Sequence, residues 1–245
     1  MQAIVLTQVC APEELALSEV PEPSVPDGAA LVRVAYCALN PLDTHARAGR
    51  IKWGVPSFPF TLGYEYSGRV VKVGAGVDAR WVGRRVCTFG QWGGCAEYAV
   101  APERELREIP DGLSWQSGTA FFTTTYTAWH LVHTAAQVRV GDIAVVHSAA
   151  GSVGVMLAQV LREAGARTIG IVGTRAKADW VRRFGLEECV VGAEQPFDAA
   201  VKAMTSGRGA DVIFDGVQGP EAPRNLACLA PFGRVYYMGA TGGPA

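Results

Sequence analysis

A short glycine-containing segment has the residue types and spacing to bind a dinucleotide. Residues 145–154 read VVHSAAGSVG, so a short apolar run leads directly into Ala149-x-Gly151-x-x-Gly154, with alanine in the first glycine place. In such a turn the middle glycine lets the backbone approach a pyrophosphate, and the last lets a helix pack closely on the strand. The N-terminus of that helix favours bound phosphate. We expect five residues to form this phosphate site: Ala150, Gly151, Ser152, Val153 and Gly154.

The residues after the next predicted strand indicate which dinucleotide binds. An NAD site usually carries an Asp or Glu about 20 residues beyond the glycines, where it holds the ribose hydroxyls. This sequence has Gly173-Thr174-Arg175-Ala176-Lys177 there, with two cations and no carboxylate. Cationic side chains pair well with a ribose 2′-phosphate. We therefore expect NADPH as the cofactor, held by Gly173, Thr174, Arg175 and Lys177. The alternative is a solvated helix start with incidental charges.

From about residue 118 the chain alternates between predicted strands and helices. Taken alone, the glycine segment could be only a tight strand-to-helix turn, but the repeated strand–helix pattern predicts βαβ units around a parallel sheet. The predicted strands are 143–147, 168–172, 189–191, 211–215 and 234–238, and helices are expected after the glycine turn and at 176–184, 197–205 and 226–229.

The number of predicted strands bears on the length of this domain. A dinucleotide-binding sheet uses about six strands in two halves. Five strands are predicted before the turn-like Gly242-Gly243-Pro244-Ala245. We expect the sequence to be a C-terminal truncation of a longer protein; the alternative is a sheet that ends short.

The chain before about residue 118 shows a different pattern of predicted elements. Short β-like runs at 30–35, 68–73, 85–88 and 96–100 alternate with turns rich in proline and glycine. This pattern predicts a compact, mostly β domain.

Composition excludes several classes of partner and location. The 245 residues carry 22 basic and 23 acidic side chains, for a formal charge of -1, so no basic field favours nucleic acid or an anionic membrane. The apolar stretches are broken well short of a bilayer span. The chain runs from Met1 straight into a strand-like segment at 3–6, so we expect no secretory signal. Six scattered cysteines without a disulfide framework are typical of reduced thiols in the cytoplasm.

Several motifs resemble one protein superfamily in order and spacing. They are CALNPLD at 37–43, PFTLGYEYSG at 59–68 and the glycine segment, with shorter matches at 94–98, 127–129 and 214–217. Together they resemble the medium-chain dehydrogenase/reductase superfamily, and most closely its zinc-independent quinone oxidoreductases, including the zeta-crystallin branch. The resemblance implies an α/β protein: a GroES-like, mostly β catalytic domain over 1–118, then a Rossmann domain with a doubly wound parallel sheet over 119–245.

The positions that hold zinc in other members of the superfamily carry unsuitable residues here. Zinc-dependent relatives have a Cys where this chain has Asn40 and a His where it has Tyr64, and neither an amide nor a neutral phenol is a good zinc ligand. Those relatives also carry a closely spaced lobe of four cysteines, whereas only Cys87 and Cys95 lie in the comparable stretch of this sequence. Two other groups suggest a metal site: Cys37 with His45, and His130-x-x-His133 on a predicted helix. The two histidines share one helix face, but no third ligand is placed beside them, and they fit partly buried or interfacial histidines. We expect no metal.

The resemblance implies a particular kind of reaction. Without zinc to polarise an alcohol or a ketone, the acceptor must already be electron-poor. Quinones and α,β-unsaturated carbonyl compounds fit, because hydride from nicotinamide C4 gives a delocalised hydroquinone or enolate anion. The protein then supplies position and electrostatics.

The resemblance also implies roles for individual residues. Asn40 is expected beside the nicotinamide ribose and the acceptor, donating an amide N–H, and Thr127 near the nicotinamide. Tyr64 departs from the usual smaller residue, and it either donates a proton or hydrogen bond to the carbonyl or only narrows the pocket. Gly192 and Gln218 also depart from common residues. Four residues after later strands are expected to line the cofactor groove: Val217, Met238, Gly239 and Ala240.

Other functions stay open at this point. Within the same chemistry, the alternatives are an enoyl reductase of polyketide or fatty-acid type and a 2-alkenal reductase. A different class is an NADPH-binding protein with little catalysis. Relatives of this type commonly dimerise, so a homodimer is also expected.

Overall fold

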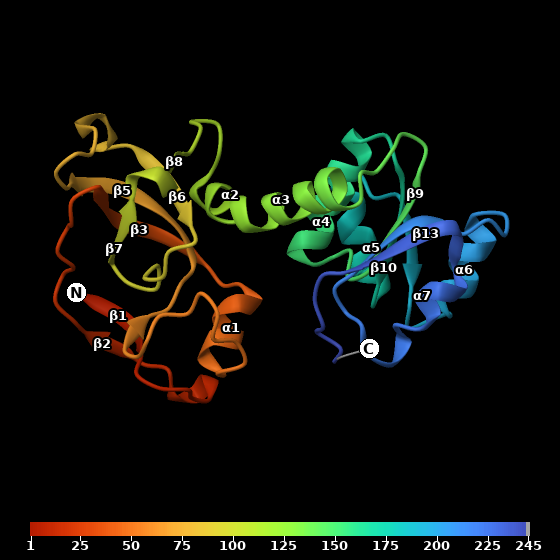
Figure 1. The fold of residues 1–245 in the computed structure, drawn as a ribbon, viewed down its shortest axis with the longest axis horizontal. Helices are drawn as coiled ribbons and strands as arrows, with labels where there is room; N and C mark the ends of the chain where they lie inside the picture. Colours follow the sequence, from red (N-terminus) through yellow and green to blue (C-terminus); the bar gives the residue numbers. More distant parts are fainter. Residues whose placement is uncertain (244–245) are drawn as a thin grey trace. The chain divides into compact units, whose positions relative to one another are not determined.

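The computed structural model describes residues 1–243 and separates the chain into two compact units, residues 1–123 and 124–245. Figure 1 shows the mostly β first unit and the α/β second unit.

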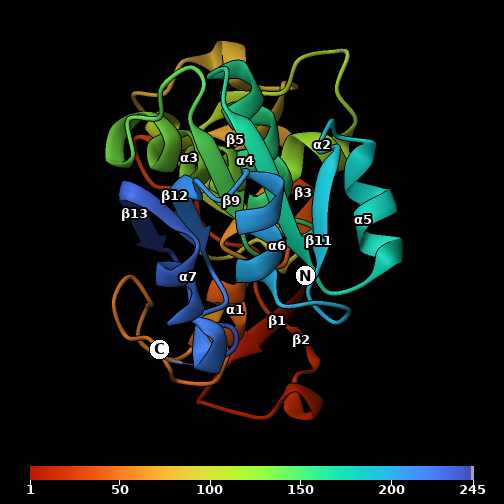
Figure 2. The same cartoon turned by 90° about the vertical axis from the view of Figure 1, so that its right-hand side faces the viewer.

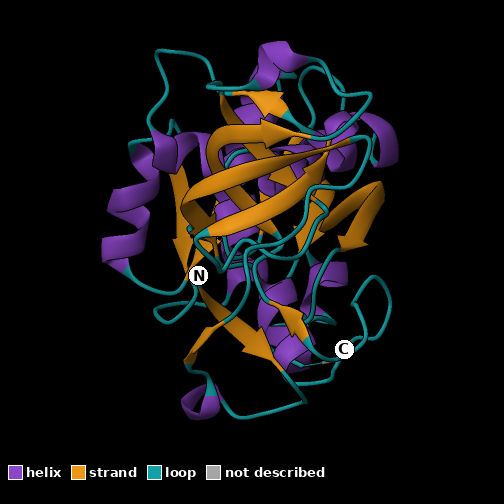
Figure 3. Ribbon diagram, turned by 90° about the vertical axis from the view of Figure 1, so that its left-hand side faces the viewer, coloured by secondary structure: helices purple, strands orange, loops and turns teal. Residues whose placement is uncertain are grey.

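A five-stranded antiparallel sheet dominates the first unit (Figure 3). In spatial order its strands are β7 (Tyr98–Pro102), β3 (Ala29–Ala38), β5 (Glu65–Val73), β6 (Arg85–Phe89) and β8 (Arg107–Glu108). The alternation of side chains along each strand sends one set to a shared apolar core, which includes Val32, Tyr66, Val70 and Val86.

A smaller antiparallel sheet lies in the same unit. Its order is β2 (Leu17–Glu19), β1 (Gln2–Leu6) and β4 (Phe60–Thr61). Two short helices accompany the sheets, α1 (Pro41–Arg47) and α2 (Trp115–Thr119). Helix α1 begins directly after Asn40 with a proline at its first position, where the missing N–H costs no helical hydrogen bond.

The second unit is built on a five-stranded parallel sheet. The spatial order is β11 (Glu188–Val191), β10 (Arg167–Val172), β9 (Ile143–Val146), β12 (Ala210–Asp215) and β13 (Leu229–Tyr237). Every neighbouring pair is parallel. The chain moves outward from β9 in one direction and then returns to its other side, so the strand order reverses between β9 and β12.

Helices cover both faces of this sheet (Figure 2). One apolar core joins the sheet to α4 (Ser152–Glu163) and α5 (Arg175–Arg182), through residues such as Leu157 and Val181. A second core, on the other face, receives Phe197 and Val201 of α6 (Phe197–Met204). Further helical segments from residue 122 onward are α3 (Phe122–Trp129), the π-helix η4 (His130–Ala135), the 3-10 helix η5 (Gly219–Glu221) and α7 (Arg224–Ala227).

The predicted architecture is confirmed, with corrections at individual elements. The predicted strand 143–147 ends at Val146, because Ser148 has φ of +50° and the chain turns there. The helix predicted over 226–229 is wrong at its end: α7 stops at Ala227 and Leu229 pairs with Ala210 as the start of β13. Of the turn predicted at 242–245, residues 244 and 245 lie outside the described part of the chain. Among residues 1–243, no helix is long and apolar enough to cross a membrane.

Candidate cofactor and substrate sites

The turn between β9 and α4 brings a helix N-terminus to the carboxyl edge of the sheet. The N–H of Gly151 donates to the carbonyl oxygen of Ser148 at 2.7 Å, which closes the turn, and α4 begins at Ser152. A Cβ on Gly154 would lie 2.5 Å from that same carbonyl oxygen, so only glycine allows α4 to pack this closely. The first N–H groups of α4 have no partner within the helix and are available to a phosphate.

Alanine at the first position of the glycine motif is matched by a glycine on the neighbouring strand. Ala149 is fully buried, and a Cβ on Gly170 of β10 would lie 2.9 Å from the Ala149 methyl carbon. The absence of a side chain at Gly170 therefore leaves room for the methyl group of Ala149, which a glycine at position 149 would not need. The turn keeps its geometry despite the departure from the usual motif.

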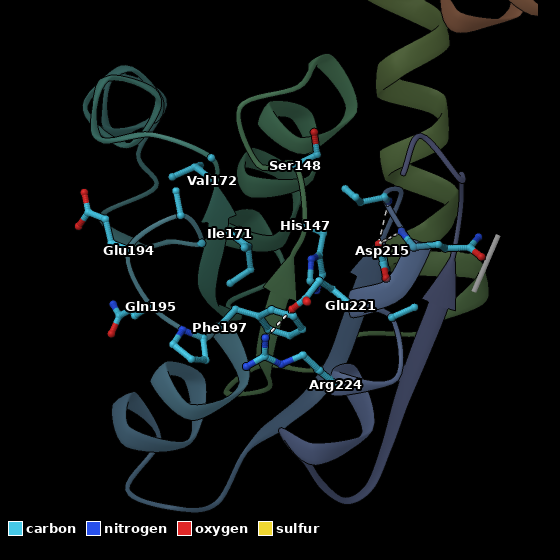
Figure 4. Close-up of a pocket in the computed structure, with 17 residues that line it drawn as sticks. His147, Ser148, Ile171, Val172, Glu194, Gln195, Phe197, Asp215, Glu221 and Arg224 are labelled. Atoms are coloured by element: carbon cyan, nitrogen blue, oxygen red, sulfur yellow. Dashed lines mark hydrogen bonds and ion pairs between the residues drawn. The ribbon is translucent and has the colours of Figure 1, made fainter. Parts of the chain in front are cut away.

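A cavity of about 650 Å³ opens at the carboxyl ends of β9, β10 and β12 and includes the loop after β11 (Figure 4). Open parallel sheets bind ligands at this edge, where the strand order reverses. Two predicted cofactor residues, Gly173 and Val217, line this cavity. Figure 4 shows His147 between Ile171 and Asp215 in its wall.

A buried hydrogen-bond network supports this wall. His147 Nε2 lies 2.8 Å from Asn225 Oδ1, and Asn225 Nδ2 donates to Asp215 Oδ2 at 2.8 Å. Because an amide oxygen can only accept, the Nε2 of His147 carries the proton that it donates. Asp215 Oδ1 in turn accepts from the backbone N–H groups of Val217 and Gln218, at 2.8 and 2.9 Å. The network therefore holds the loop after β12 in place.

Burial and hydrogen bonding set the charges of this network. Burial lowers the pKa of His147, although the charge of Asp215 and the bond to Asn225 oppose the shift. Burial alone would raise the pKa of Asp215, but the N–H groups of Gln218 and Val217 outweigh it and hold that pKa below its usual range. A neutral imidazole beside an ionised carboxylate follows near neutral pH.

The predicted phosphate-binding cation is already paired with a carboxylate. Arg175 Nη2 lies 2.7 Å from Glu194 Oε2, and Glu194 lines the cavity. The hydroxyl of Thr174 accepts from the N–H of Lys177 at 3.3 Å, so it caps α5. Arg175 and Lys177 are both exposed. Any phosphate at the end of β10 must therefore compete with Glu194 for the guanidinium of Arg175.

Four other predicted cofactor residues lie elsewhere in the second unit. The N–H of Met238 donates to the carbonyl oxygen of Asp215 at 2.9 Å, which ties the ends of β13 and β12 together. A Cβ on Gly239 would lie 3.0 Å from the carbonyl oxygen of Gly216, so glycine permits this approach. Ala240, the next residue, is exposed to solvent, and Thr127 lies in α3. The lining of the 650 Å³ cavity includes none of these four residues: Thr127, Met238, Gly239 and Ala240.

In the first unit, one buried carboxylate joins the two predicted catalytic residues. Asp43 is 4% exposed. Its Oδ2 accepts from the N–H of Asn40 at 2.9 Å, and its Oδ1 accepts from the N–H groups of Gly63 and Tyr64, at 3.1 and 3.2 Å. Burial raises the pKa of Asp43 despite these bonds. The structure thus brings the backbones of Asn40 and Tyr64 to the same side chain.

The Asn40 amide is oriented by a second buried carboxylate. Asn40 Nδ2 donates to Glu65 Oε2 at 3.1 Å, and Glu65 is 1% exposed. The other oxygen, Glu65 Oε1, accepts from the N–H of Thr123 at 2.9 Å. Both oxygens of the carboxylate therefore have a donor, and the Asn40 side chain is fixed by one of them.

The Tyr64 ring packs against an aromatic neighbour. Its centroid lies 5.3 Å from that of Trp92, in an edge-on arrangement at 63°. The hydroxyl faces Gly90, whose Cβ, if present, would lie 3.7 Å from it and 3.9 Å from Glu105 Oε2. Burial, and secondarily the charge of Glu105, raise the pKa of Tyr64. The phenol therefore stays protonated and can donate a hydrogen bond.

The histidines considered as metal ligands have other surroundings. His130 Nδ1 lies 3.1 Å from Thr134 Oγ1, and the His133 ring centroid lies 4.1 Å from that of Trp129. Within residues 1–243, no three His, Cys, Asp or Glu side chains are grouped so that they could hold a metal ion.

Sequence reasoning missed several residues that shape these sites: Asp43, Glu65, His147, Glu194, Asp215 and Asn225. His147 directly follows one buried apolar run, and Asp215 ends another. Polar residues at the carboxyl ends of parallel strands indicate a ligand site, so these two could have been found from the sequence. Glu194 follows β11 in the same way. Asn225 and Glu65 have no such signal, because their importance depends on contacts between distant segments.

Comparison with known proteins agrees with this architecture. Residues 26–111 match the family model of the alcohol dehydrogenase GroES-like domain, and residues 152–245 match that of the zinc-binding dehydrogenases. Quinone oxidoreductase of Homo sapiens is 30% identical over 244 residues, covering 99% of this chain and 74% of that protein. The 2-haloacrylate reductase of a Burkholderia species is 30% identical over 251 residues, covering 100% of this chain and 75% of that protein.

A solved structure shows the same fold. The Escherichia coli quinone oxidoreductase complexed with NADPH superposes with a TM-score of 0.91 at 26% identity, covering 100% of this chain and 75% of that one. The chain belongs to the medium-chain dehydrogenase/reductase superfamily, in its quinone oxidoreductase-like group. It is a member of an oxidoreductase family, with a GroES-like and a Rossmann unit.

Proposed function

We propose that this chain is an NADPH-dependent reductase that transfers a hydride to a quinone or to an activated carbon–carbon double bond. The observation that carries the proposal is the cavity at the point where the strand order reverses. Ser148, in the turn that leads into α4, lines this cavity, and so does Glu194, the partner of Arg175. These are the surroundings that a pyrophosphate and a ribose 2′-phosphate require. The relative that is complexed with NADPH supports the choice of cofactor.

The two kinds of acceptor are supported by the relatives and by the chemistry. One relative is named for quinones and another for a haloacrylate, an activated alkene. In both cases bound NADPH would supply a hydride, with its electron pair, to an electron-poor carbon or to the quinone. A proton from solvent or from the protein would complete the reduction. No metal ion is needed in this scheme, and Asn40 and Tyr64 stand at the positions used for zinc in other members of the superfamily.

The proposed roles of the residues follow from their contacts. Asn40, fixed through Glu65, is proposed to donate an amide N–H toward the acceptor or the nicotinamide ribose. Tyr64 is proposed as a hydrogen-bond donor, since its phenol stays protonated. Val217, Thr127 and the end of β13 are proposed to contact the nicotinamide half of the cofactor.

Two measurements test the proposal. Calorimetric titration with NADPH and NADH measures whether and how selectively the nucleotide binds. The nicotinamide absorbance then follows oxidation of NADPH with a panel of quinones, enones and enoyl thioesters, in the presence of a strong chelator. Faster oxidation with enoyl thioesters than with quinones would favour the enoyl reductase alternative. Tight NADPH binding with no turnover on any acceptor would favour a binding protein and contradict the proposal.

A further inference from the structure

Two cysteine side chains from distant parts of the first unit meet beside the Asn40 loop. Cys37 lies in β3, and Cys95 lies 58 residues later, in the segment before β7. Their Sγ atoms are 3.6 Å apart, and both residues are partly exposed to solvent. Two sulfur atoms in contact need only a small movement to form a disulfide.

The backbone around these two thiols is tightly organised. Gly63 packs closely against both residues: a Cβ there would be 2.7 Å from Cys37 Sγ and 2.4 Å from the backbone nitrogen of Cys95. The N–H of Cys95 donates to the carbonyl oxygen of Leu62 at 2.8 Å, and its own carbonyl oxygen accepts from Ile4 at 2.8 Å. The backbone of Cys95 is therefore tied to Leu62 and Ile4, and Cys37 lies within β3.

Each thiol changes the acidity of the other. The hydrogen bond between the two sulfurs lowers the pKa of Cys95, although burial opposes this shift. The same bond, followed by burial, raises the pKa of Cys37. Since the thiolate is the nucleophile, these two directions favour Cys95 as the sulfur that attacks and Cys37 as the one that resolves. Cys87 differs, because it is buried and its sulfur donates to the carbonyl oxygen of Arg107 at 3.5 Å.

We propose that Cys37 and Cys95 form a reversible modification site, a dithiol that a peroxide converts into an intramolecular disulfide. The Cys95 thiolate attacks one peroxide oxygen, the O–O bond breaks, and a sulfenic acid forms with release of one water. Cys37 sulfur then attacks the Cys95 sulfur, forms the S–S bond and displaces the second water. The two thiols lose two electrons and two protons, and hydrogen peroxide is reduced to two waters.

The location of this dithiol connects it to the proposed substrate site. The sulfurs must approach by about 1.5 Å to reach bonding distance, which draws the end of β3 toward the segment at Gly63. Asn40 follows Cys37 by three residues, and the N–H of Gly63 donates to Asp43, which also accepts from Asn40. Oxidation is therefore expected to displace Asn40 and lower turnover several-fold. This consequence rests on the proposed function.

Peptide mapping tests the modification itself. The protein is treated with hydrogen peroxide, blocked with an alkylating reagent and digested with trypsin. The expected product joins residues 34–47, which contain Cys37, to residues 86–104, which contain both Cys87 and Cys95. The Cys87→Ser variant should keep this cross-link and Cys95→Ser should lose it, and a thiol reductant should reverse it. No such cross-link, or one that survives in Cys95→Ser, would overturn the proposal.

Activity is measured as a separate readout on the same samples. NADPH oxidation should fall several-fold with peroxide, recover with reductant, and be insensitive to peroxide in Cys95→Ser. A cross-link with unchanged turnover would overturn the link to Asn40 while leaving the modification site. If no variant turns over substrate, the proposed function fails, and the peptide map still decides on the disulfide.

Discussion

The guanidinium of Arg175 and the carboxylate of Glu194, which lines the cavity, form an ion pair at 2.7 Å on the residues that follow two adjacent parallel strands, β10 and β11. Arg175, the cation predicted to bind a ribose 2′-phosphate, is thus paired with a carboxylate from a different segment of the chain. We therefore expect cofactor choice to depend on both residues.

Removing the carboxylate should strengthen NADPH binding. The side chains of Arg175 and Glu194 are 79% and 41% exposed, so the pair contributes no more than about 1 kcal/mol. Glu194→Gln is therefore expected to lower the Kd for NADPH about threefold, with little change for NADH. Arg175→Ala should raise the Kd for NADPH about tenfold. Calorimetric titration of both nucleotides checks these values.

The matched control for these variants is Arg182→Ala, in the last turn of the same helix, where the side chain pairs with Asp179. It should leave both affinities unchanged. Weaker NADPH binding in Glu194→Gln would mean that Glu194 does not compete with the phosphate.

A methyl group at Gly154 should disrupt the phosphate turn. The added carbon would lie 2.5 Å from the carbonyl oxygen of Ser148 and 2.7 Å from Ala149 Cα, and both are backbone atoms that cannot rotate away. Gly154→Ala is expected to lower the free energy of unfolding by about 2 kcal/mol and to abolish NADPH binding. Gly112→Ala, where no atom lies within 4 Å of the added carbon, should change neither. Denaturant unfolding and titration measure the two effects, and a Gly154→Ala protein with normal stability would contradict the packing argument.

The buried histidine should make stability depend on pH on the acid side of neutrality. The pKa of His147 is lowered in the folded state from its ordinary 6.5, so below that pH the unfolded chain binds a proton that the folded chain does not. Stability is then complete above about pH 7 and falls as pH drops through 6.5, until the folded pKa is reached. In His147→Gln this loss should be smaller. Unfolding free energies measured from pH 7.5 to 5 give the slopes, and equal slopes in the two proteins would rule out His147 as the source.

Glu65, which accepts a hydrogen bond from the Asn40 amide, is expected to affect both stability and turnover. Glu65→Ala removes a buried carboxylate that accepts from the Asn40 amide and from the N–H of Thr123, and we expect the free energy of unfolding to fall by about 2 kcal/mol or more. Glu65→Gln keeps one acceptor oxygen and should cost less stability, yet it should still lower turnover because Asn40 is reoriented. Unfolding and initial-rate measurements separate the two effects. Equal turnover in Glu65→Gln and the unmutated protein would contradict a positioning role for Glu65.

The parts of the fold that could be predicted are those set by local patterns. The strands of the second unit are short apolar runs, and Gly151 and Gly154 mark the turn, so the sequence predicts the parallel sheet and the turn between β9 and α4 at the right places. The end of the last helix was predicted wrongly because Leu229 is apolar in either element, and only its pairing with Ala210 decides between them.

The details of the sites could not be predicted because they depend on contacts between distant segments. The space for Ala149 comes from Gly170, the partner of Asn40 is Glu65, and the partner of Arg175 is Glu194. None of these pairs has a sequence spacing that identifies it. The domain boundary after residue 118 and the individual cofactor contacts stay predictions.

The central claim is hydride transfer from NADPH to an electron-poor acceptor, and isotope transfer tests it most directly. The protein is incubated with an α,β-unsaturated ketone and NADPH that carries deuterium at C4, in separate reactions for the two C4 positions. Mass and NMR analysis of the saturated product locate the label. We predict deuterium at the β-carbon from one of the two labelled cofactors, and a solvent hydrogen at the α-carbon. Product without deuterium from either cofactor, or labelled cofactor that is bound but never oxidised, would contradict the account.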